Sequence, residues 1–267
     1  MSSKIAFIGA GNIATAIVSG SINSGYIKPS QIYMYDICED KLKKFTKYGV
    51  NTSLDIIEIV SKCDYIFLTV KPQIYEEVLL SIKNSISSEK CIISVAAGIS
   101  IDYVKKCIGY DCKVIRVMPN TPLMCCKGAS ALVNTAPVTK DNFDFIKGIF
   151  DTCGKTAVVQ EELMDTITGV SGSSPAFIFR FIRNLINTGV DNGLDYETSK
   201  KMVLATIVGS AEMISVSDES IDNLIKNVAS PNGTTEAGLK FLDNNNFDYI
   251  VENSVKAAIE RSKELKK

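Results

Sequence analysis

The small residues between Gly9 and Ala14 have the clearest chemical meaning in this sequence. Gly9, Gly11 and Ala14 fill a G-x-G-x-x-A pattern directly after the apolar run Lys4–Ile8. Gly9 allows a tight turn, Gly11 lets a backbone approach a pyrophosphate, and Ala14 lets a helix pack close to a strand. Free N–H groups at the start of that helix favour phosphate charge. An ordinary glycine-rich turn is the alternative. The strand before the pattern and the helix after it favour a dinucleotide site made by Gly9, Ala10, Gly11, Asn12, Ile13 and Ala14.

A carboxylate follows at the spacing that such a site needs. Asp36 ends a second short strand, Gln31–Tyr35, and lies twenty-two residues beyond Ala14. There it would accept hydrogen bonds from the adenosine ribose and repel a 2′-phosphate, which favours NADH over NADPH. Lys41 is close enough to receive a 2′-phosphate instead, so the cofactor is NADPH or NADH. Asp36 could also cap the helix expected over Glu39–Tyr48, and the two roles are compatible.

Composition excludes several classes of protein. The chain has 267 residues, 46% of them hydrophobic, and a net charge of −1. This charge gives no footprint for nucleic acid or an anionic membrane, and no apolar run is long enough to cross a bilayer. The first strand begins at once, which leaves no room for a signal peptide. The eight cysteines form no C-x-x-C pair, so we expect reduced thiols in a cytoplasmic protein.

The absence of histidine limits the chemistry. With no imidazole in the sequence, the chain lacks the commonest general acid–base group, the commonest metal ligand and any Ser-His or Cys-His nucleophile. We therefore predict no metal site and a reaction that does not need imidazole.

The elements that position these residues alternate through the first half of the chain. This βαβ order predicts a doubly wound, mostly parallel α/β sheet, in which ligands lie beyond the carboxyl ends of the strands. The expected strands are Lys4–Ile8, Gln31–Tyr35, Tyr65–Val70, Cys91–Ala96, Lys113–Val117, Gly128–Val133 and Thr156–Val159. The expected helices are Ala14–Ile22, Glu39–Tyr48, Ser53–Cys63 with Ser53 as N-cap, Ile74–Ile82, Ile101–Cys107 and Asn142–Phe150. Three stretches should share the ligand edge, namely Gly9–Ile13, Val70–Gln73 and Ala96–Gly98.

Helical patterns replace strands from Glu161 onwards. We therefore predict a dinucleotide-binding domain over residues 1–160 and an all-helical domain over residues 161–267. The helix that begins near Pro175 is apolar nearly all round, so it must be buried either as a central core helix or at a subunit interface. The expected helices are Glu161–Gly169, Pro175–Asn192, Tyr196–Ser215, Ser220–Asn227, Thr234–Asp243 and Phe247–Leu265.

Two loops have open interpretations. Met118–Pro122 contains two prolines and is either a rigid connector or a loop that contacts a ligand. Val228–Thr235 ends in a helix start with free N–H groups at Gly233 and Thr234 and a hydroxyl at Thr235, which would suit a small anion. A helix that is simply well capped would have the same residues.

Six motifs in this order resemble one family, pyrroline-5-carboxylate reductase. They are FIGAGNIA, VKPQ, VAAGIS, VMPNTP, VSGSSPAFIF at Val170–Phe179, and NVASPNGTT, and they span essentially the whole chain. The resemblance implies a Rossmann domain followed by an all-helical dimerisation domain, in homodimers that often assemble into decamers. It also implies hydride transfer from NADPH or NADH to 1-pyrroline-5-carboxylate, which gives L-proline in the final step of proline biosynthesis. A cyclic imine accepts a proton easily, so this reaction agrees with the missing histidine.

The resemblance also implies site residues. The cofactor would be held by Gly9 to Ala14 and by Val70, Lys71, Pro72 and Gln73, with Ala96, Ala97 and Gly98 beside the nicotinamide and Asn227 as a further contact. Ser230, Gly233 and Thr234 match positions around the substrate carboxylate, and Thr235 matches the catalytic hydroxyl near the imine nitrogen. Three residues depart from the family pattern: Ser174 and Asn232 replace glycines, and Ile56 replaces an Asn near the ribose.

Two other functions stay open. β-Hydroxyacid dehydrogenases share the plan of a Rossmann domain plus a helical domain, but they use a catalytic lysine, for which Lys200 and Lys201 are the candidates here. A nucleotide-sensing protein that has lost catalysis is the second. The presence of Gly9, Gly11 and Thr235 argues against it.

Overall fold

The computed structural model describes residues 3–267. The chain divides into two compact units. Unit 1 comprises the residues up to Ser173 together with Ala257–Lys267, and unit 2 comprises Ser174–Lys256. The helix α12 (Phe247–Glu264) begins in unit 2 and ends in unit 1.

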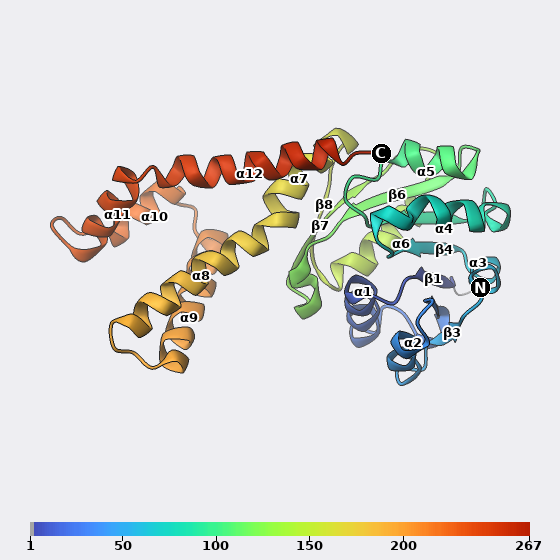
Figure 1. Cartoon of the computed structure of the whole chain (residues 1–267), viewed down its shortest axis with the longest axis horizontal. Coiled ribbons are helices and arrows are strands. Elements are labelled where there is room, and N and C mark those ends of the chain that lie inside the picture. The colour runs from blue at the N-terminus through green and yellow to red at the C-terminus, as the bar shows by residue number, and fades with distance from the viewer. Residues whose placement is uncertain (1–2) are drawn as a thin grey trace. The chain divides into compact units, whose positions relative to one another are not determined.

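Unit 1 is built on one eight-stranded sheet with the strand order β3-β2-β1-β4-β5-β6-β7-β8 (Figure 1). All neighbouring strands are parallel except β6 and β7. Ile5 at the centre pairs in register with Ile32 on one side and Tyr65 on the other. The prediction of a doubly wound, mostly parallel sheet is therefore confirmed. The strands are β1 Ile5–Ile8, β2 Ile32–Tyr35, β3 Asn51–Ser53, β4 Tyr65–Leu68, β5 Cys91–Ser94, β6 Lys113–Met118, β7 Gly128–Val133 and β8 Gly154–Val158.

Helices cover both faces of this sheet, and each face has its own hydrophobic core. Successive strand residues point to opposite faces, so Phe7 belongs to one core and its neighbours Ala6 and Ile8 to the other. Phe7 stacks on Phe67 with 4.6 Å between ring centroids in the first core. Residues of α1, α2 and α6 complete that core, and residues of α3, α4 and α5 complete the second. These helices are α1 Asn12–Asn23, α2 Glu39–Thr46, α3 Ile56–Lys62, α4 Tyr75–Ile82, α5 Ile101–Ile108 and α6 Lys140–Asp151.

The region around Ser53 differs from the prediction. The sequence predicts a helix capped by Ser53, but Ser53 ends strand β3 and pairs with Tyr35. Helix α3 begins later because Asp55 is its N-cap and accepts hydrogen bonds from the N–H groups of Ile57 and Glu58. Aspartate is at least as good an N-cap as serine, and here it lies two residues nearer the apolar run. The polar strand β3 was missed because Asn51–Ser53 lacks the apolar residues that reveal buried strands.

The link between the sheet and the long helices also differs. The sequence predicts one helix over Glu161–Gly169. The structure has a 3-10 turn (Glu161–Leu163), α7 (Met164–Ile167) and a π-helical segment (Thr168–Ser173) that runs directly into α8 (Ser174–Asp191). Small residues permit this wide segment: a Cβ atom at Gly172 would lie 2.6 Å from the methyl group of Met118.

The remaining helices agree with the sequence to within one or two residues at each end. They are α9 Tyr196–Val216, α10 Ile221–Val228, α11 Thr234–Asn244 and α12. In α8, however, only Pro175 and Ile186 are buried, and Phe179 is 61% exposed. The interpretation of α8 as a central core helix is therefore wrong for the single chain. Of the two interpretations, the subunit interface stands.

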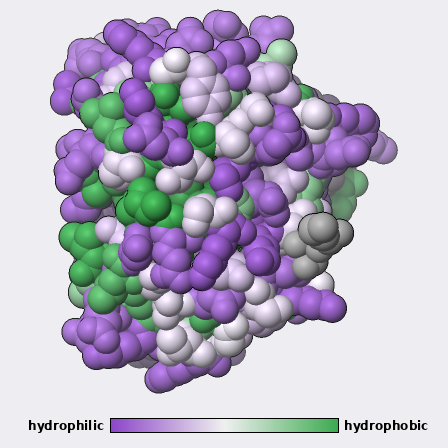
Figure 2. Space-filling model, turned by 90° about the vertical axis from the view of Figure 1, so that its right-hand side faces the viewer, coloured by the Kyte–Doolittle hydropathy of each residue, from purple (hydrophilic) through white to green (hydrophobic). Residues whose placement is uncertain are grey.

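The surface of unit 1 is more hydrophilic than the apolar surface of α8. Figure 2 looks onto unit 1, where hydrophilic side chains surround smaller hydrophobic patches. Within residues 3–267, no helix combines the length and apolar character needed to span a bilayer.

Candidate cofactor and substrate sites

The turn after β1 requires glycine at its first position. Gly9 has φ +107°, and a Cβ atom there would lie 2.9 Å from the carbonyl oxygen of Thr69. Its N–H donates to the carbonyl of Tyr35 at 2.8 Å, and the Thr69 hydroxyl donates to the carbonyl of Gly9 at 2.6 Å. The turn is thus fixed between strands β2 and β4, and only glycine fits it without strain.

Gly11 has a different role, because the space beside it is open. It is the N-cap of α1 with no side-chain cap, and a Cβ atom there would meet no other atom within 4 Å. The first helical hydrogen bond joins Thr15 N–H to Gly11 C=O at 3.0 Å, so the N–H groups of Asn12, Ile13 and Ala14 precede the helical ladder. An open glycine cradle with unpaired amides at a helix start fits a diphosphate.

Asp36 is more constrained than the sequence indicates. Its Oδ2 accepts from the N–H of Ala10 at 2.8 Å, and its Oδ1 accepts from the N–H of Cys38 at 2.9 Å. Lys41 lies 3.5 Å from Oδ2, and Asp36 is only 7% exposed. The helix-cap interpretation is wrong, because the N-cap of α2 is Cys38, which makes no side-chain cap. Asp36 instead joins the glycine turn to the end of β2, and Lys41 offsets part of its charge.

The two other expected stretches lie at the same edge of the sheet as the glycine turn, because β1, β4 and β5 are neighbours and parallel. Val70 and Lys71 lead into a 3-10 turn at Pro72–Ile74, which includes Gln73. Ala96–Gly98 follows β5, and Gly98 has φ +74°. The structure therefore brings together the three stretches that the sequence assigns to the cofactor.

A buried tyrosine, Tyr75, forms hydrogen bonds with the ends of strands β4 and β5 at this edge. The Tyr75 hydroxyl donates to the carbonyl of Leu68 at 2.7 Å, and the Ser94 hydroxyl lies 3.3 Å from it. Burial raises the pKa of Tyr75, which keeps the phenol neutral. Sequence reasoning assigned Tyr75 no role. Its apolar helix position gave no sign that its hydroxyl joins strands β4 and β5.

Two further polar contacts were also missed. Arg116, 3% exposed, forms an ion pair with Glu161 at 3.0 Å, and the same Glu161 oxygen accepts from the N–H of Ile101 at 2.8 Å. A lone arginine inside the apolar strand Lys113–Val117 was the available signal.

In the MPNTP loop, Asn120 accepts from the N–H of Ala129 at 2.8 Å and donates to the carbonyl of Ser171 at 3.3 Å. These contacts match the rigid connector, and ligand contact by this loop stays a prediction.

The expected substrate loop lies in unit 2 and is partly as predicted. Gly233 is the N-cap of α11, but its N–H is not free, because it donates to the carbonyl of Ser230 at 2.9 Å. The turn uses that amide to close on itself. The N–H groups of Thr234 and Thr235 precede the first helical hydrogen bond, which joins Ala237 to Gly233. They remain the available donors at this helix start.

Thr235 also lines a small apolar pocket of about 280 Å³. Its other lining residues come from α9, α10 and α11, and they include Met213, Leu224 and Leu239. Asn227, at the end of α10, donates to Glu219 at 2.8 Å and is exposed. A pocket whose lining has two hydroxyl residues, Ser210 and Thr235, among apolar side chains can hold a small ring and offer it a hydrogen bond.

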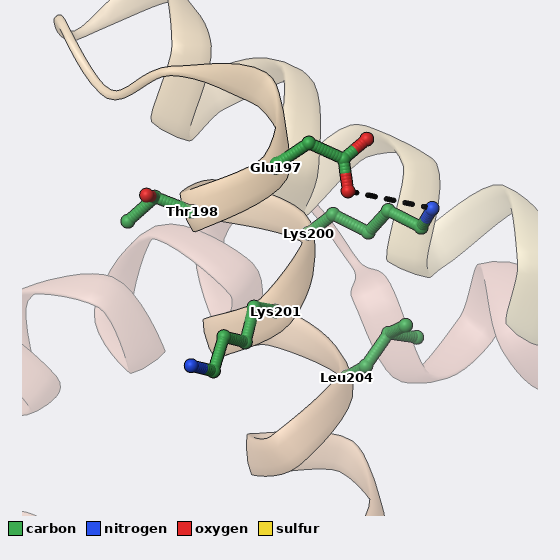
Figure 3. Close-up of a pocket in the computed structure, with 5 residues that line it drawn as sticks. All are labelled: Glu197, Thr198, Lys200, Lys201 and Leu204. Atoms are coloured by element: carbon green, nitrogen blue, oxygen red, sulfur yellow. Dashed lines mark ion pairs between the residues drawn. The ribbon is translucent and has the colours of Figure 1, made fainter.

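The lysines of the alternative function have no catalytic surroundings. Figure 3 shows Lys200 paired with Glu197, one turn away on α9, while Lys201 points to the other side of the helix. The Lys200–Glu197 distance is 3.8 Å, and Lys200 also lies over the ring of Tyr196 at 5.8 Å. Both lysines lie on an open part of the surface, and this arrangement is that of a solvated helix.

Comparisons with known proteins agree with this geometry. The family model "Pyrroline-5-carboxylate reductase dimerisation" matches residues 161–265, and the model "NADP oxidoreductase coenzyme F420-dependent" matches residues 4–98. The pyrroline-5-carboxylate reductase of Escherichia coli is 34% identical, with 100% of each chain covered. That of Methanosarcina acetivorans is 36% identical over 99% of this chain and 98% of its own.

A solved structure gives the same result. The Plasmodium falciparum pyrroline carboxylate reductase with NADP bound superimposes with a TM-score of 0.92 and 35% identity. The match covers 99% of this chain and 98% of that chain. Since these matches span both units, the chain belongs to the pyrroline-5-carboxylate reductase family.

Proposed function

We propose that this protein transfers a hydride from NADPH or NADH to 1-pyrroline-5-carboxylate and so forms L-proline, the final step of proline biosynthesis. The observation that carries the proposal is the full-length identity of 34–36% to pyrroline-5-carboxylate reductases, over an alignment that covers 99–100% of this chain. The chain also contains Gly9, Gly11 and Thr235, whose loss would have favoured a catalytically inactive relative.

The cofactor half is supported by the glycine geometry. Gly9–Ala14 would hold the diphosphate through the open space at Gly11 and the amides of α1. Val70–Gln73 would hold the cofactor farther along the sheet edge, and Ala96–Gly98 would lie beside the nicotinamide. When bound, the cofactor supplies the hydride. The chain's own task is to hold the two reactants in one orientation and to keep water out.

The substrate half requires an anion site and one hydroxyl. The amides of Thr234 and Thr235 would bind the substrate carboxylate, with Ser230 and Gly233 shaping the turn. The Thr235 hydroxyl would donate a hydrogen bond to the neutral imine nitrogen of the ring. Once that nitrogen is protonated, the hydroxyl oxygen would accept a hydrogen bond from its N–H, so that no strong enzymic acid is needed. Asn227 would contact the cofactor from the preceding helix.

The oligomeric state, the cellular location and the domain limits are further parts of this proposal. The helical domain supports a homo-oligomer, with a dimer as its basic form. We infer a decamer, a cytoplasmic location, and domain limits at residues 160 and 161 as finer features of the same proposal.

A single assay tests the function. Purified protein is incubated with NADPH or NADH and 1-pyrroline-5-carboxylate, and the loss of reduced nicotinamide absorbance is followed together with proline formation. A parallel panel of β-hydroxyacids with the oxidised cofactors tests the alternative reductase. Turnover of β-hydroxyacids without turnover of the imine would overturn the proposal. Cofactor binding with no turnover of any substrate would indicate a nucleotide-sensing protein.

A further inference from the structure

The last residues of the chain lie against the loop that follows β5. The N–H of Lys267 donates to the carbonyl of Gly98 at 2.7 Å. The carbonyl oxygen of Lys267 accepts from the hydroxyl of Ser100 at 2.7 Å and from its N–H at 3.3 Å. One residue is therefore bonded on both sides of Ile99, and Figure 1 shows the C-terminal end beside α5, which starts just after this loop. All of these residues belong to unit 1.

The loop and the tail are shaped for each other at Gly98. Gly98 is buried with φ +74°, and a Cβ atom there would lie 2.9 Å from the carbonyl oxygen of Leu265. A side chain at this position would displace the tail as well as strain the loop. The tail thus occupies space that only glycine leaves open.

The tail is itself anchored to the frame of unit 1. Near the end of α12, the hydroxyl of Ser262 donates to the carboxylate of Asp165 at 2.7 Å, and both residues are buried. The ammonium group of Lys267 lies 5.8 Å from the ring centroid of Tyr103 on α5. The segment Leu265–Lys267 is therefore fixed at both of its ends, and its hydrogen bonds hold the loop in one position.

We propose that Leu265–Lys267 is a strap that positions the backbone of Ala96–Gly98 against the nicotinamide end of the cofactor. This inference rests on the proposed function for the placement of the nicotinamide. Within residues 3–267, the hydrogen bonds between the strap and this loop involve Gly98 and Ser100, so we treat it as a positioning element that supplies no chemical group. Its loss should disturb the nicotinamide end and leave the diphosphate end at Gly9–Ala14 unchanged.

Removal of residues 265–267 tests the strap, with binding measured separately for NADPH and for ADP-ribose that carries the same 2′-phosphate and lacks only the nicotinamide. Three lost hydrogen bonds predict an increase of about three- to tenfold in the Kd for NADPH, with less than about twofold for ADP-ribose. Ser100→Ala, which removes one of these bonds, should give a smaller change in the same direction. Its matched control is Thr139→Ala, which removes the side-chain cap of α6 as Ser100→Ala removes that of α5, but touches no tail residue.

An equal rise in the Kd of both ligands, or no change in either Kd, would overturn the inference. The tail would then contribute to stability alone, or would have no effect on binding. A thermal unfolding midpoint for each variant identifies simple loss of stability. Binding is measured without an imine, so a failure of the proposed reductase activity would appear separately, in the turnover of the unmodified protein.

Discussion

Two helices of this protein begin in nearly the same way but in different surroundings. Both α1 and α11 have a glycine N-cap with extended backbone, at Gly11 and Gly233, and neither has a side-chain cap. By contrast, α3, α5, α6, α9 and α10 are capped by Asp55, Ser100, Thr139, Asp195 and Ser220. A side-chain cap occupies the first amides of a helix, whereas a glycine leaves them for a ligand. These two N-termini are also the two places where the proposed function needs an anion to bind: the cofactor diphosphate at α1 and the substrate carboxylate at α11.

The surroundings of the two starts differ in burial. α1 packs on the sheet, with Ala14 and Ile17 fully buried. α11 has no buried residue in the single chain, and Phe241 is 69% exposed. The proposed anion site at α1 would thus be complete within a single chain. The proposed site at α11 lies on helices whose apolar surface is exposed in the single chain. A family model for dimerisation matches those helices, which identifies a second copy of the chain as the cover of that surface.

Separation of the two subunits tests whether the helical domain depends on a partner chain. Phe179 is 61% exposed in the single chain, and Phe179→Glu places a charge on this apolar face of α8. Burying an unpaired charge costs several kcal/mol, so we expect monomers and a loss of reductase activity of roughly a hundredfold or more. NADPH binding should persist, because unit 1 completes its own core. Sedimentation equilibrium and a binding titration on the same sample measure both.

Phe179→Leu is the matched control, since it keeps the apolar surface and should stay dimeric. A Phe179→Glu protein that remains a dimer with full activity would show that α8 is not at the interface. Loss of NADPH binding together with activity would show that unit 1 also depends on the partner copy.

The two glycines of the turn should respond differently to the same methyl group. Gly9→Ala meets the Thr69 carbonyl at 2.9 Å in a left-handed backbone, so both stability and cofactor affinity should fall, the affinity by about tenfold to a hundredfold. Gly11→Ala meets no protein atom and should leave the melting temperature unchanged while it weakens NADPH binding. If Gly11→Ala binds NADPH normally, the diphosphate does not approach Gly11 and the assignment is wrong.

Thr235 tests the second helix start. Thr235→Ala removes the hydroxyl but keeps the backbone amides, so kcat/KM for the imine should fall with little change in cofactor affinity. The expected loss is about 1–3 kcal/mol, or roughly tenfold to a hundredfold. Thr235→Ser retains the hydroxyl and should recover most of the activity. An effect of Thr235→Ala on NADPH affinity with unchanged imine kinetics would assign this loop to the cofactor instead.

The sequence was most informative where one residue type has one physical use. Gly9 and Gly11, the parallel strands and the long helices were predicted correctly in kind because turn geometry and apolar runs are local signals. The polar strand Asn51–Ser53 and the π-segment before α8 were missed, since each is set by neighbours far along the chain. The Tyr75–Ser94 contact and the Arg116–Glu161 pair had no local signal of their partners. Only the folded sheet reveals which strands bring them together.

Cofactor preference is a smaller effect, and it depends on charges beside the first helix start. The sequence predicts that Asp36 favours NADH, but Lys41 lies 3.5 Å from its carboxylate. Lys41→Ala removes this compensation, so kcat/KM with NADPH should fall relative to NADH by about two- to fivefold, the scale of an exposed ion pair. The ratio should also lose part of its salt dependence. Lys43→Ala, whose lysine pairs with Asp40 instead, is the control. An unchanged ratio in Lys41→Ala would show that this lysine does not face the ribose.

The smallest expected effect concerns the thiols, which separate the packed sheet from its exposed loops. Burial raises the pKa of Cys63 and of Cys91 to about 12, from an ordinary value of 9.0. In the folded protein these thiols stay neutral at pH 9 and should resist iodoacetamide, whereas the exposed Cys125 and Cys126 should be alkylated first, as mass spectrometry would show. Above pH 9 the unfolded chain releases these protons and the folded chain keeps them, so the free energy of unfolding should fall as the pH rises towards 12. Cys63→Ala should reduce that slope, even though it lowers stability at neutral pH. Rapid alkylation of Cys63 in the folded protein would show that the core of unit 1 opens more readily than its packing implies.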